Sequence, residues 1–272
     1  MSRITLASTV TLEGIGLHSG ESSQVTLSPA PAGSGRIFVR EGVEIPALAD
    51  YVTDTRRSTT VGRNGVTVST VEHLLAACVL EDIDDVRIDV AGPELPALDG
   101  AALTWVDAIS AAGVCRRDGE QSSLTVQEPI WIADGDAMFF LCPAETFTVY
   151  AAVDIPDTQV IRQCAGGPVT RPEVKTQLAR ARTYALAAEV QSLLDAGLAR
   201  GGSLENALVL TPEGYLNDRV WPQEPAWHKA LDLCGDLALA GAYLRGSVLA
   251  VRAGHRSHVA LVRQLRDLPC TS

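Results

Sequence analysis

The sequence lacks several patterns that mark well-defined protein classes. None of its six cysteines forms a C-x-x-C pair, and their scatter among apolar neighbours is typical of reduced thiols. No early segment has the charged start and apolar middle of a signal peptide, and no run approaches the roughly 18 apolar residues of a membrane span. We therefore expect a cytoplasmic protein without a transmembrane segment.

Positive charge is also scarce. The 272 residues include 22 Lys and Arg against 33 Asp and Glu, a formal net charge of −11. A phosphate backbone would repel such a chain, which excludes a general nucleic-acid binder but not a local basic pocket for one anionic ligand. A hydrophobic content of 46% and a charged content of 20% indicate a folded globular protein, large enough for one big domain or two ordinary ones.

Hydrophobic periodicity predicts an α+β fold. Expected strands cover residues 3–12, 23–29, 36–40, 65–68, 85–90, 124–132, 137–141, 147–155 and 246–251. Expected helices cover residues 69–77, 101–112, 172–181, 187–194 and 258–268, in addition to one around 226–236. Residues 115–123 are polar and are predicted to link two α+β domains of similar size, residues 1–120 and 121–272.

Residues 226–236 carry a possible metal-binding pattern. In a helix, His228 and Asp232 lie four residues apart on one face, and Asp236 continues that face by one turn. An imidazole and a carboxylate at this spacing can bind one divalent metal, although such a pair is more often a solvated surface pair. A metal site would need a third ligand from elsewhere in the chain.

The search for that third ligand is short, because histidine is rare. The chain has five: His18, His73, His228, His255 and His258. His73 follows Glu72 at the start of a predicted helix and would complete a His₂Asp set, the arrangement of a catalytic zinc with one open position. A structural alternative exists for Glu72, because Ser69 and Glu72 match the S-x-x-E capping box.

The polar residues around this set suggest hydrolysis. A zinc-bound water has a pKa of about 7, and Glu72 lies next to a ligand, where it could act as the base. His255 could protonate a leaving amine, Asp236 could orient a histidine, and Lys229 could contact a phosphate or a substrate oxygen. Taken singly, each residue fits a structural or solvated role better, so the hypothesis depends on their conjunction.

Several motifs occur together in one order along the chain. They are G-L-H-S-G at 16–20, S-T-V-E-H-L at 69–74, E-L-P-A-L-D-G at 94–100, R-A-R-T-Y at 180–184, G-G-S at 201–203, H-K-A-L-D at 228–232 and residues 247–255 ending in G-H. With these motifs the chain resembles the UDP-3-O-acyl-N-acetylglucosamine deacetylases, the zinc amidases of lipid A biosynthesis. The resemblance extends from about residue 3 to residue 262.

This resemblance implies a fold and a site. Two α+β domains would pack their helices together and leave their sheets outside, with the active site between them. Zinc would bind His73, His228 and Asp232, and Fe(II) could occupy the same ligands. Glu72 would be the general base, and His255, tuned by Asp236, the general acid or oxyanion stabiliser.

The implied reaction is hydrolysis of the N-acetyl group of UDP-3-O-(3-hydroxyacyl)-N-acetylglucosamine. Acetate and a free 2-amine would be released in the committed step of lipid A biosynthesis, by an enzyme expected to be a monomer. Thr183 would help to bind the carbonyl oxygen, and Lys229 and Arg252 the anionic nucleotide. The remaining expected substrate contacts are His18, Tyr184, Gly201 and Ser203.

The resemblance also implies a hydrophobic passage for the acyl chain within residues 184–210. Its expected lining is Leu186, Val190, Leu193, Leu194 and Leu198, although leucines at helical spacing more often belong to a core. The chain departs from the family pattern at Arg56-Arg57, residues 154–157, Tyr184 and Trp227. None of these positions is an expected metal ligand or base.

Two other functions remain open from the sequence. The chain could be a zinc hydrolase of a different acylated sugar nucleotide, or a non-catalytic binding protein on the same fold. A binding protein would not need both Glu72 and His255 as proton carriers, which favours an enzyme.

Overall fold

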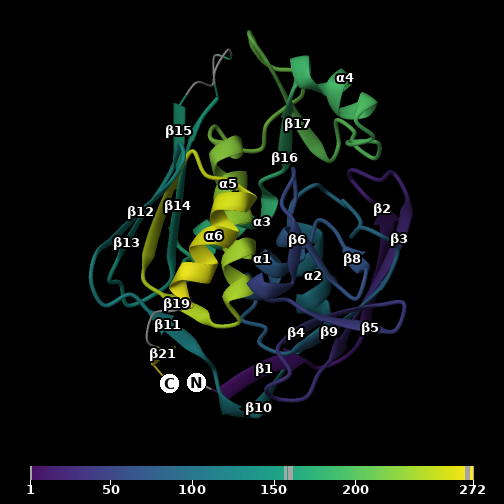
Figure 1. Cartoon of the computed structure of the whole chain (residues 1–272). Helices are drawn as coiled ribbons and strands as arrows, with labels where there is room; N and C mark the ends of the chain where they lie inside the picture. The colour runs from purple at the N-terminus through teal and green to yellow at the C-terminus, as the bar shows by residue number, and fades with distance from the viewer. Residues whose placement is uncertain (1, 156–157, 159–161, 267–269, 272) are drawn as a thin grey trace.

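Two five-stranded sheets form the outer layers of the protein, with the helices between them (Figure 1). The computed structural model describes residues 2–155, 158, 162–266 and 270–271. The first sheet runs in the order β2 (Val10–Ile15), β3 (Ser22–Pro29), β9 (Val86–Ala91), β4 (Arg36–Arg40), β5 (Val43–Pro46). The second runs β12 (Ile130–Asp134), β13 (Ala137–Cys142), β20 (Ser247–Val251), β14 (Thr148–Asp154), β15 (Arg162–Pro168). The predicted α+β class is confirmed.

The two sheets have the same topology. Across each sheet, the first two pairs of neighbouring strands are antiparallel, the third pair is parallel and the fourth is antiparallel. The parallel pair is β9 with β4 in the first sheet and β20 with β14 in the second. In each half, the strand that the chain reaches last, β9 or β20, is inserted in the middle of the sheet. The halves therefore repeat one structural plan, which no short sequence repeat reveals.

The helices between the sheets are α1 (Glu72–Leu80), α2 (Leu103–Ala112), α3 (Pro172–Arg180), α5 (Glu224–Leu237) and α6 (His255–Leu265), whereas α4 (Ala187–Asp195) lies beyond one end of the sheets (Figure 1). Two short 3-10 turns are η1 (Ala49–Tyr51) and η2 (Ala238–Ala240). Within the described ranges, no helix is both long enough and apolar enough to span a membrane.

Four small sheets complete the described structure. They contain β1 (Ser2–Leu6) with β10 (Val114–Glu120), β6 (Val52–Asp54) with β7 (Thr60–Arg63) and β8 (Val66–Val68), β16 (Thr183–Leu186) with β17 (Ala207–Thr211) and β18 (Gly214–Tyr215), and β19 (Tyr243–Arg245) with β11 (Ser123–Thr125) and β21 (Cys270–Thr271).

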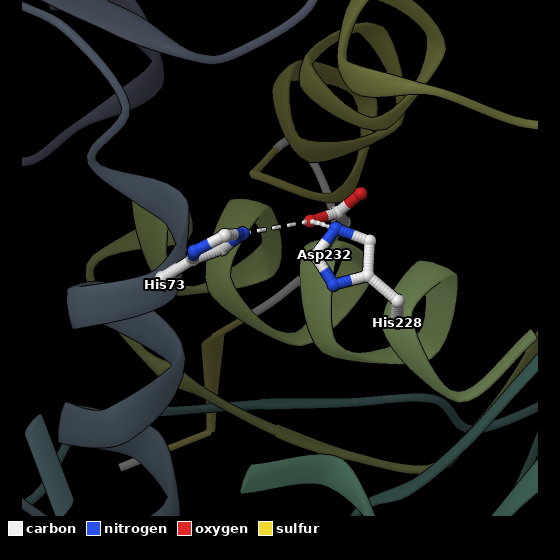
Figure 2. Close-up of side chains that lie close together, drawn as sticks. All are labelled: His73, His228 and Asp232. Atoms are coloured by element: carbon white, nitrogen blue, oxygen red, sulfur yellow. Dashed lines mark ion pairs between the residues drawn. The ribbon is translucent and has the colours of Figure 1, made fainter. Parts of the chain in front are cut away.

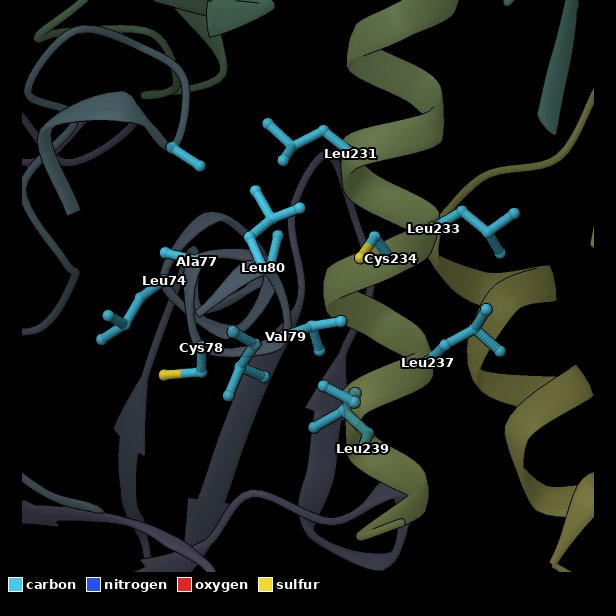
Figure 3. Close-up of a cluster of buried hydrophobic side chains, with 14 of the residues drawn as sticks. Leu74, Ala77, Cys78, Val79, Leu80, Leu231, Leu233, Cys234, Leu237 and Leu239 are labelled. Carbon is cyan, nitrogen blue, oxygen red and sulfur yellow. The ribbon is translucent and has the colours of Figure 1, made fainter. Parts of the chain in front are cut away.

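Helices α1 and α5 cross at the centre of the core. All nine residues of α1 are buried, and Val79 and Leu80 lie on the side of α1 that faces Leu231 and Cys234 of α5 (Figure 3). Gly235 permits this close approach, since a Cβ atom there would lie 2.0 Å from the carbonyl oxygen of Glu72. The crossing sets the start of α1 beside the middle of α5.

Several predicted boundaries are wrong. Residues 115–123, predicted as a linker, mostly form β10, which pairs with β1, so only residues 121–122 separate β10 from β11. The expected strand over 3–12 is divided into β1 and β2, and the last helix begins at His255 rather than His258. Its predicted end at residue 268 lies outside the described residues.

The capping-box interpretation of Glu72 is also wrong. Helix α1 begins at Glu72 itself, Val71 is its N-cap, and no side chain in the described structure caps it. Ser69 Oγ instead accepts a hydrogen bond from Thr60 Oγ1. The carboxylate of Glu72 is therefore available for another role.

Candidate metal centre and catalytic cavity

Three buried side chains converge where α1 meets α5 (Figure 2). His73 Nε2 lies 3.6 Å and His228 Nε2 3.3 Å from Asp232 Oδ1. Each of the three offers one ligand atom, and these atoms lie within 4.8 Å of one another. Asp232 Oδ1 is buried and finds no hydrogen-bond partner among the described residues. Because an unpartnered buried carboxylate oxygen is costly, the group fits a bound cation.

The protonation states of His228 and Asp232 suit a metal. Burial lowers the pKa of His228 to about 3, and its Nδ1 lies 3.0 Å from the carbonyl oxygen of Ala181. The ring is therefore neutral, with Nδ1–H donating to the carbonyl and the Nε2 lone pair free. Burial would raise the pKa of Asp232, but His228 and Lys229 hold it well below its usual value.

Lys229 and Asp232 form a direct ion pair. Lys229 Nζ lies 2.8 Å from Asp232 Oδ2 and 5.6 Å from the centre of the Tyr184 ring. The ammonium group thus pairs with the other carboxylate oxygen of Asp232, Oδ2, and leaves Oδ1 between the two imidazoles. The roles expected for Lys229 at the phosphate or the substrate oxygen stay predictions.

Glu72 lies beside the three converging side chains. It is 2% exposed, its Oε2 accepts a 3.0 Å hydrogen bond from the Thr59 amide, and its Oε1 lies 3.9 Å from His255 Nε2. Burial raises the pKa of Glu72 above its ordinary value. A carboxyl group whose pKa moves toward neutrality can both accept and release a proton.

A buried network holds His255 from the opposite side. His255 Nδ1 and His258 Nδ1 each lie 2.8 Å from Asp236 Oδ2, and the Thr59 hydroxyl donates to Asp236 Oδ1 at 2.6 Å. Burial would lower the pKa of His255, but the charges of Asp236, Glu72 and Asp232 outweigh it and raise the pKa to about 9. His255 is therefore protonated at neutral pH.

Sequence reasoning missed two members of this network, His258 and Thr59. His258 follows His255 by three residues on α6, a spacing that places both on one helix face and could have indicated the pair. Thr59 precedes β7 and is distant in sequence from the other members, so no local pattern indicates it.

A cavity of about 900 Å³ opens onto these residues. Its wall includes most of the predicted site residues: Glu72, His73, His228, Lys229, Asp232, His255, His18, Thr183, Tyr184, Ser203 and Arg252. Asp236 lies behind His255, and Gly201 packs against the Gly16 carbonyl oxygen, with its amide donating to Leu17 O. The structure therefore brings these residues together at one cavity wall, while Gly201 makes a loop contact, and their functional roles stay predictions.

Residues 16–20, here called the His18 loop, close one side of the cavity. The Glu94 carboxylate accepts hydrogen bonds from the His18 amide at 3.0 Å, the Ser19 amide at 2.7 Å and the Thr70 hydroxyl at 2.7 Å. Sequence reasoning quoted Glu94 within a motif but gave it no role. Gly16 lies so close to this carboxylate that a Cβ atom there would be 2.5 Å from Glu94 Oε2.

Apolar side chains cover another part of the cavity wall. Val190 and Leu193 of α4 line it as predicted, together with Leu204, Val209 and Leu216. Leu186, Leu194 and Leu198 are not part of the lining that the described residues form, and Leu194 is 41% exposed. Leu186 instead packs against a small cluster around Ile155 and Leu210.

The residues at which the chain departs from the family pattern lie in different parts of the structure. Arg57 lines the cavity, and its Nη2 lies 3.1 Å from Glu189 Oε2 of α4. Trp227 is buried in the core. In the segment 154–157, Asp154 ends β14 and Ile155 is buried, while Pro156 and Asp157 lie outside the described residues.

Comparison with known proteins shows the family of the chain. The model of the UDP-3-O-acyl N-acetylglycosamine deacetylase family, LpxC, matches residues 3–267. The chain belongs to this deacetylase family. A relative from Anaeromyxobacter sp. (strain Fw109-5) with the name UDP-3-O-acyl-N-acetylglucosamine deacetylase is 42% identical over 98% of this chain and 89% of its own length.

Two further relatives have the same name. The protein of Thermosynechococcus vestitus is 41% identical over 96% of this chain and 93% of its own length. That of Synechocystis sp. (strain PCC 6803) is 39% identical over 97% and 98%. As a member of the deacetylase family, the chain is an amide-hydrolysing enzyme of lipid A biosynthesis. The family consists of metalloenzymes, and the group of His73, His228 and Asp232 could hold the metal.

Proposed function

We propose that the chain hydrolyses the N-acetyl group of UDP-3-O-(3-hydroxyacyl)-N-acetylglucosamine in a zinc-dependent reaction that releases acetate and a free 2-amine. The observation that carries the proposal is the orphaned Asp232 Oδ1, which lies between two histidines and beside Glu72 and His255 in the wall of a large cavity. Zinc accepts this ligand set and leaves one position open for catalysis.

His73, His228 and Asp232 would hold the zinc. When bound there, the metal supplies Lewis-acid activation of the acetamide carbonyl and of the attacking water. Fe(II) could occupy the same ligands, because imidazole and carboxylate groups suit both metals. Lys229, through its ion pair, keeps Asp232 ionised and fixed in orientation.

Glu72 would take the proton from the attacking water at its Oε1 atom. Its other oxygen is fixed by the Thr59 amide, which leaves Oε1 directed toward His255. The raised pKa that burial gives Glu72 favours its acceptance of that proton. The carboxyl group then serves as a proton shuttle as well as a base.

His255 would give its Nε2 proton to the leaving amine or stabilise the oxyanion with the same proton. Asp236 holds His255 at Nδ1, which keeps the proton-bearing Nε2 directed toward Glu72 and Asp232. Thr183 in the cavity wall would contact the carbonyl oxygen, and Arg252 the nucleotide anion. Tyr184, Ser203 and the apolar wall around Val190 would contact the sugar and the acyl chain.

Further parts of the proposal concern organisation. The division into domains 1–120 and 121–272 is supported by the short gap between β10 and β11 and by one five-stranded sheet in each half. A cytoplasmic location is supported by the free thiols at Cys78, Cys115, Cys142, Cys164 and Cys234. The monomeric state stays a prediction, which sedimentation or light scattering would test.

The deciding experiment measures acetate release from the acylated sugar nucleotide before and after chelation, and again after zinc is returned. We expect more than about 90% of activity to disappear with the metal and to return with zinc. Full activity in thoroughly metal-free protein would contradict the proposal. Metal-loaded protein that releases no acetate would favour a binding protein, and faster turnover of a substrate with another nucleotide or acyl group would favour the related hydrolase.

A further inference from the structure

Glu94 is a buried carboxylate that no part of the proposed chemistry uses. It is 2% exposed and accepts hydrogen bonds from the His18 and Ser19 amides and from the Thr70 hydroxyl. Successive backbone amides directed at one anion form a nest, a concave anion-binding site. In this protein the nest of the His18 loop is filled by the chain's own carboxylate.

The sequence of the His18 loop fits this contact. A Cβ atom at Gly16 would lie 2.5 Å from Glu94 Oε2 and 2.5 Å from Ser19 Oγ, so only glycine leaves room for the carboxylate at this distance. Across the loop, the amides of Arg200 and Gly201 donate to the carbonyl oxygens of His18 and Leu17. The loop is therefore held on two sides, by Glu94 and by the segment that follows α4.

The held loop presents His18 to the cavity. The Ala199 amide donates to His18 Nδ1 at 3.4 Å, so the neutral ring carries its proton on Nε2. That Nε2 atom is buried and has no hydrogen-bond partner within the described part of the chain. A buried donor without a partner is unfavourable until a ligand supplies an acceptor. An uncharged oxygen of the acylated sugar, either the ester carbonyl or a hydroxyl, has the required chemistry.

The backbone around Glu94 does not depend on its side chain. Bridges between Gly16 and Pro96 and between Ser69 and Glu94 join the neighbouring segments through main-chain groups. Loss of the carboxylate should therefore release residues 18–19 while it leaves the fold and the metal site in place.

We propose that Glu94 is a positioning residue, whose carboxylate fixes the His18 loop so that His18 Nε2 can bind an oxygen of the acylated sugar substrate. The inference rests on the proposed function, because it needs that substrate in the cavity. It predicts an effect on substrate affinity that passes through His18, and no effect on metal binding.

The test compares Glu94→Gln, His18→Ala and the double variant as zinc-loaded enzymes. Glutamine keeps the size of the side chain, but it removes the negative charge and one of the two acceptor oxygens, which weakens the nest. We expect each single variant to raise KM about tenfold with kcat changed less than about threefold, as the loss of one substrate hydrogen bond would do. The double variant should be no worse than His18→Ala alone. Glu21→Gln, which makes the same charge change at an exposed position directly after the loop, is the matched control.

Several results would overturn the inference. An unchanged KM in folded Glu94→Gln would do so, and so would additive effects in the double variant, since additivity means that Glu94 does not act through His18. If Glu94→Gln fails to fold, Glu94→Asp keeps the charge but reaches less far, and it must raise KM by about twofold or more. An unchanged KM in Glu94→Asp would also contradict the inference.

Failure of the proposed function would look different. Wild-type enzyme would then release no acetate, whereas failure of the inference leaves wild-type activity intact. In the former case the ring nitrogens of His18, observed by NMR in ¹⁵N-histidine protein, still test positioning. Their signals should shift and broaden in Glu94→Gln and stay unchanged in Glu21→Gln, and identical spectra for all three proteins would contradict the inference.

Discussion

At the scale of single residues, two neighbouring proton carriers have raised pKa values for different physical reasons. Burial raises the pKa of Glu72, whereas the surrounding carboxylates raise the pKa of His255 to about 9. One group can therefore accept a proton at neutral pH while the other already holds one. His255 Nε2 lies 3.9 Å from Glu72 Oε1.

Glu72 should be essential for turnover but not for metal binding. Glu72→Gln keeps the hydrogen-bonding shape and removes the base, so we expect kcat to fall by about 10²–10⁴-fold. Zinc content should stay at the wild-type level, because Glu72 is not one of the three converging ligands. Acetate release and metal analysis measure the two effects, with Glu128→Gln at an exposed position as the control. Wild-type turnover in Glu72→Gln would contradict the assigned role.

Asp236 should set the alkaline limit of activity. Its charge helps to raise the pKa of His255, so Asp236→Asn should lower that pKa. If protonated His255 is the active form, activity is lost as pH rises through its pKa, and the alkaline limb of kcat/KM should move to lower pH by about one unit or more. The pH profiles of the two proteins measure this shift. An alkaline limb that does not move would show that the limb does not report His255.

At the scale of elements, the crossing of α1 and α5 assembles the site. His73 lies on α1, and His228 and Asp232 lie one turn apart on α5, so the metal group exists only where the two helices touch (Figure 2). Gly235 is the position of closest approach, with the Glu72 carbonyl oxygen 2.0 Å from where a Cβ atom would lie. The same contact between α1 and α5 therefore packs the core and brings the three possible metal ligands together.

Gly235→Ala should damage the site through the distance between the helices. The added methyl group cannot fit against the backbone of α1, so we expect a loss of about 1–3 kcal/mol in the free energy of unfolding despite alanine's better helix propensity. Zinc affinity should fall at the same time, because His73 moves away from His228 and Asp232.

Urea unfolding and competition with a chelator measure the two effects of Gly235→Ala. Ala111→Gly, at an exposed position of α2, should cost about 1 kcal/mol with no change in zinc affinity. Wild-type zinc affinity in Gly235→Ala would show that the ligand geometry tolerates helix separation.

At the scale of the whole molecule, buried charges join segments that are distant in sequence. Asp85, which is fully buried, accepts from Arg3 Nε at 2.7 Å, Arg3 Nη2 at 2.8 Å and the Gly35 amide at 2.7 Å. These contacts tie β1 to the segments that precede β4 and β9. Burial would raise the pKa of Asp85, but Arg3 and Gly35 outweigh it and lower the pKa below its ordinary value of 3.8.

This lowered pKa predicts how stability depends on pH. A carboxyl group with a lowered pKa stabilises the fold above about pH 4, and this contribution is lost as pH falls through the folded-state pKa. Asp85→Asn should therefore lower the free energy of unfolding by about 1–3 kcal/mol at pH 7, and the difference from wild type should shrink below pH 4.

Urea unfolding at several pH values measures the effect of Asp85→Asn. The control is Asp89→Asn, whose ion pair with Arg87 is about two-fifths exposed on both sides and should contribute about 1 kcal/mol or less. An Asp85→Asn difference that grows as pH falls would contradict the predicted sign.

The sequence by itself determined the chemistry and the class of fold. Rare histidines and the four-residue spacing of His228 and Asp232 limited the ligand candidates, because helical geometry relates such spacing directly to one face. Periodicity located most of the main helices and sheet strands, since it follows from local burial. It failed at residues 115–123, where a polar segment forms an edge strand because β1 supplies its hydrogen bonds.

Only the tertiary structure decided how distant residues share a site. Thr59, Glu94 and His258 act through partners 13 to 177 positions away along the chain, and no local pattern reports such a partner. The structure also decided which leucines face the cavity, because helical spacing is the same for a core face and a cavity face. Local periodicity records that a side chain is buried. What it is buried against depends on how the two halves pack.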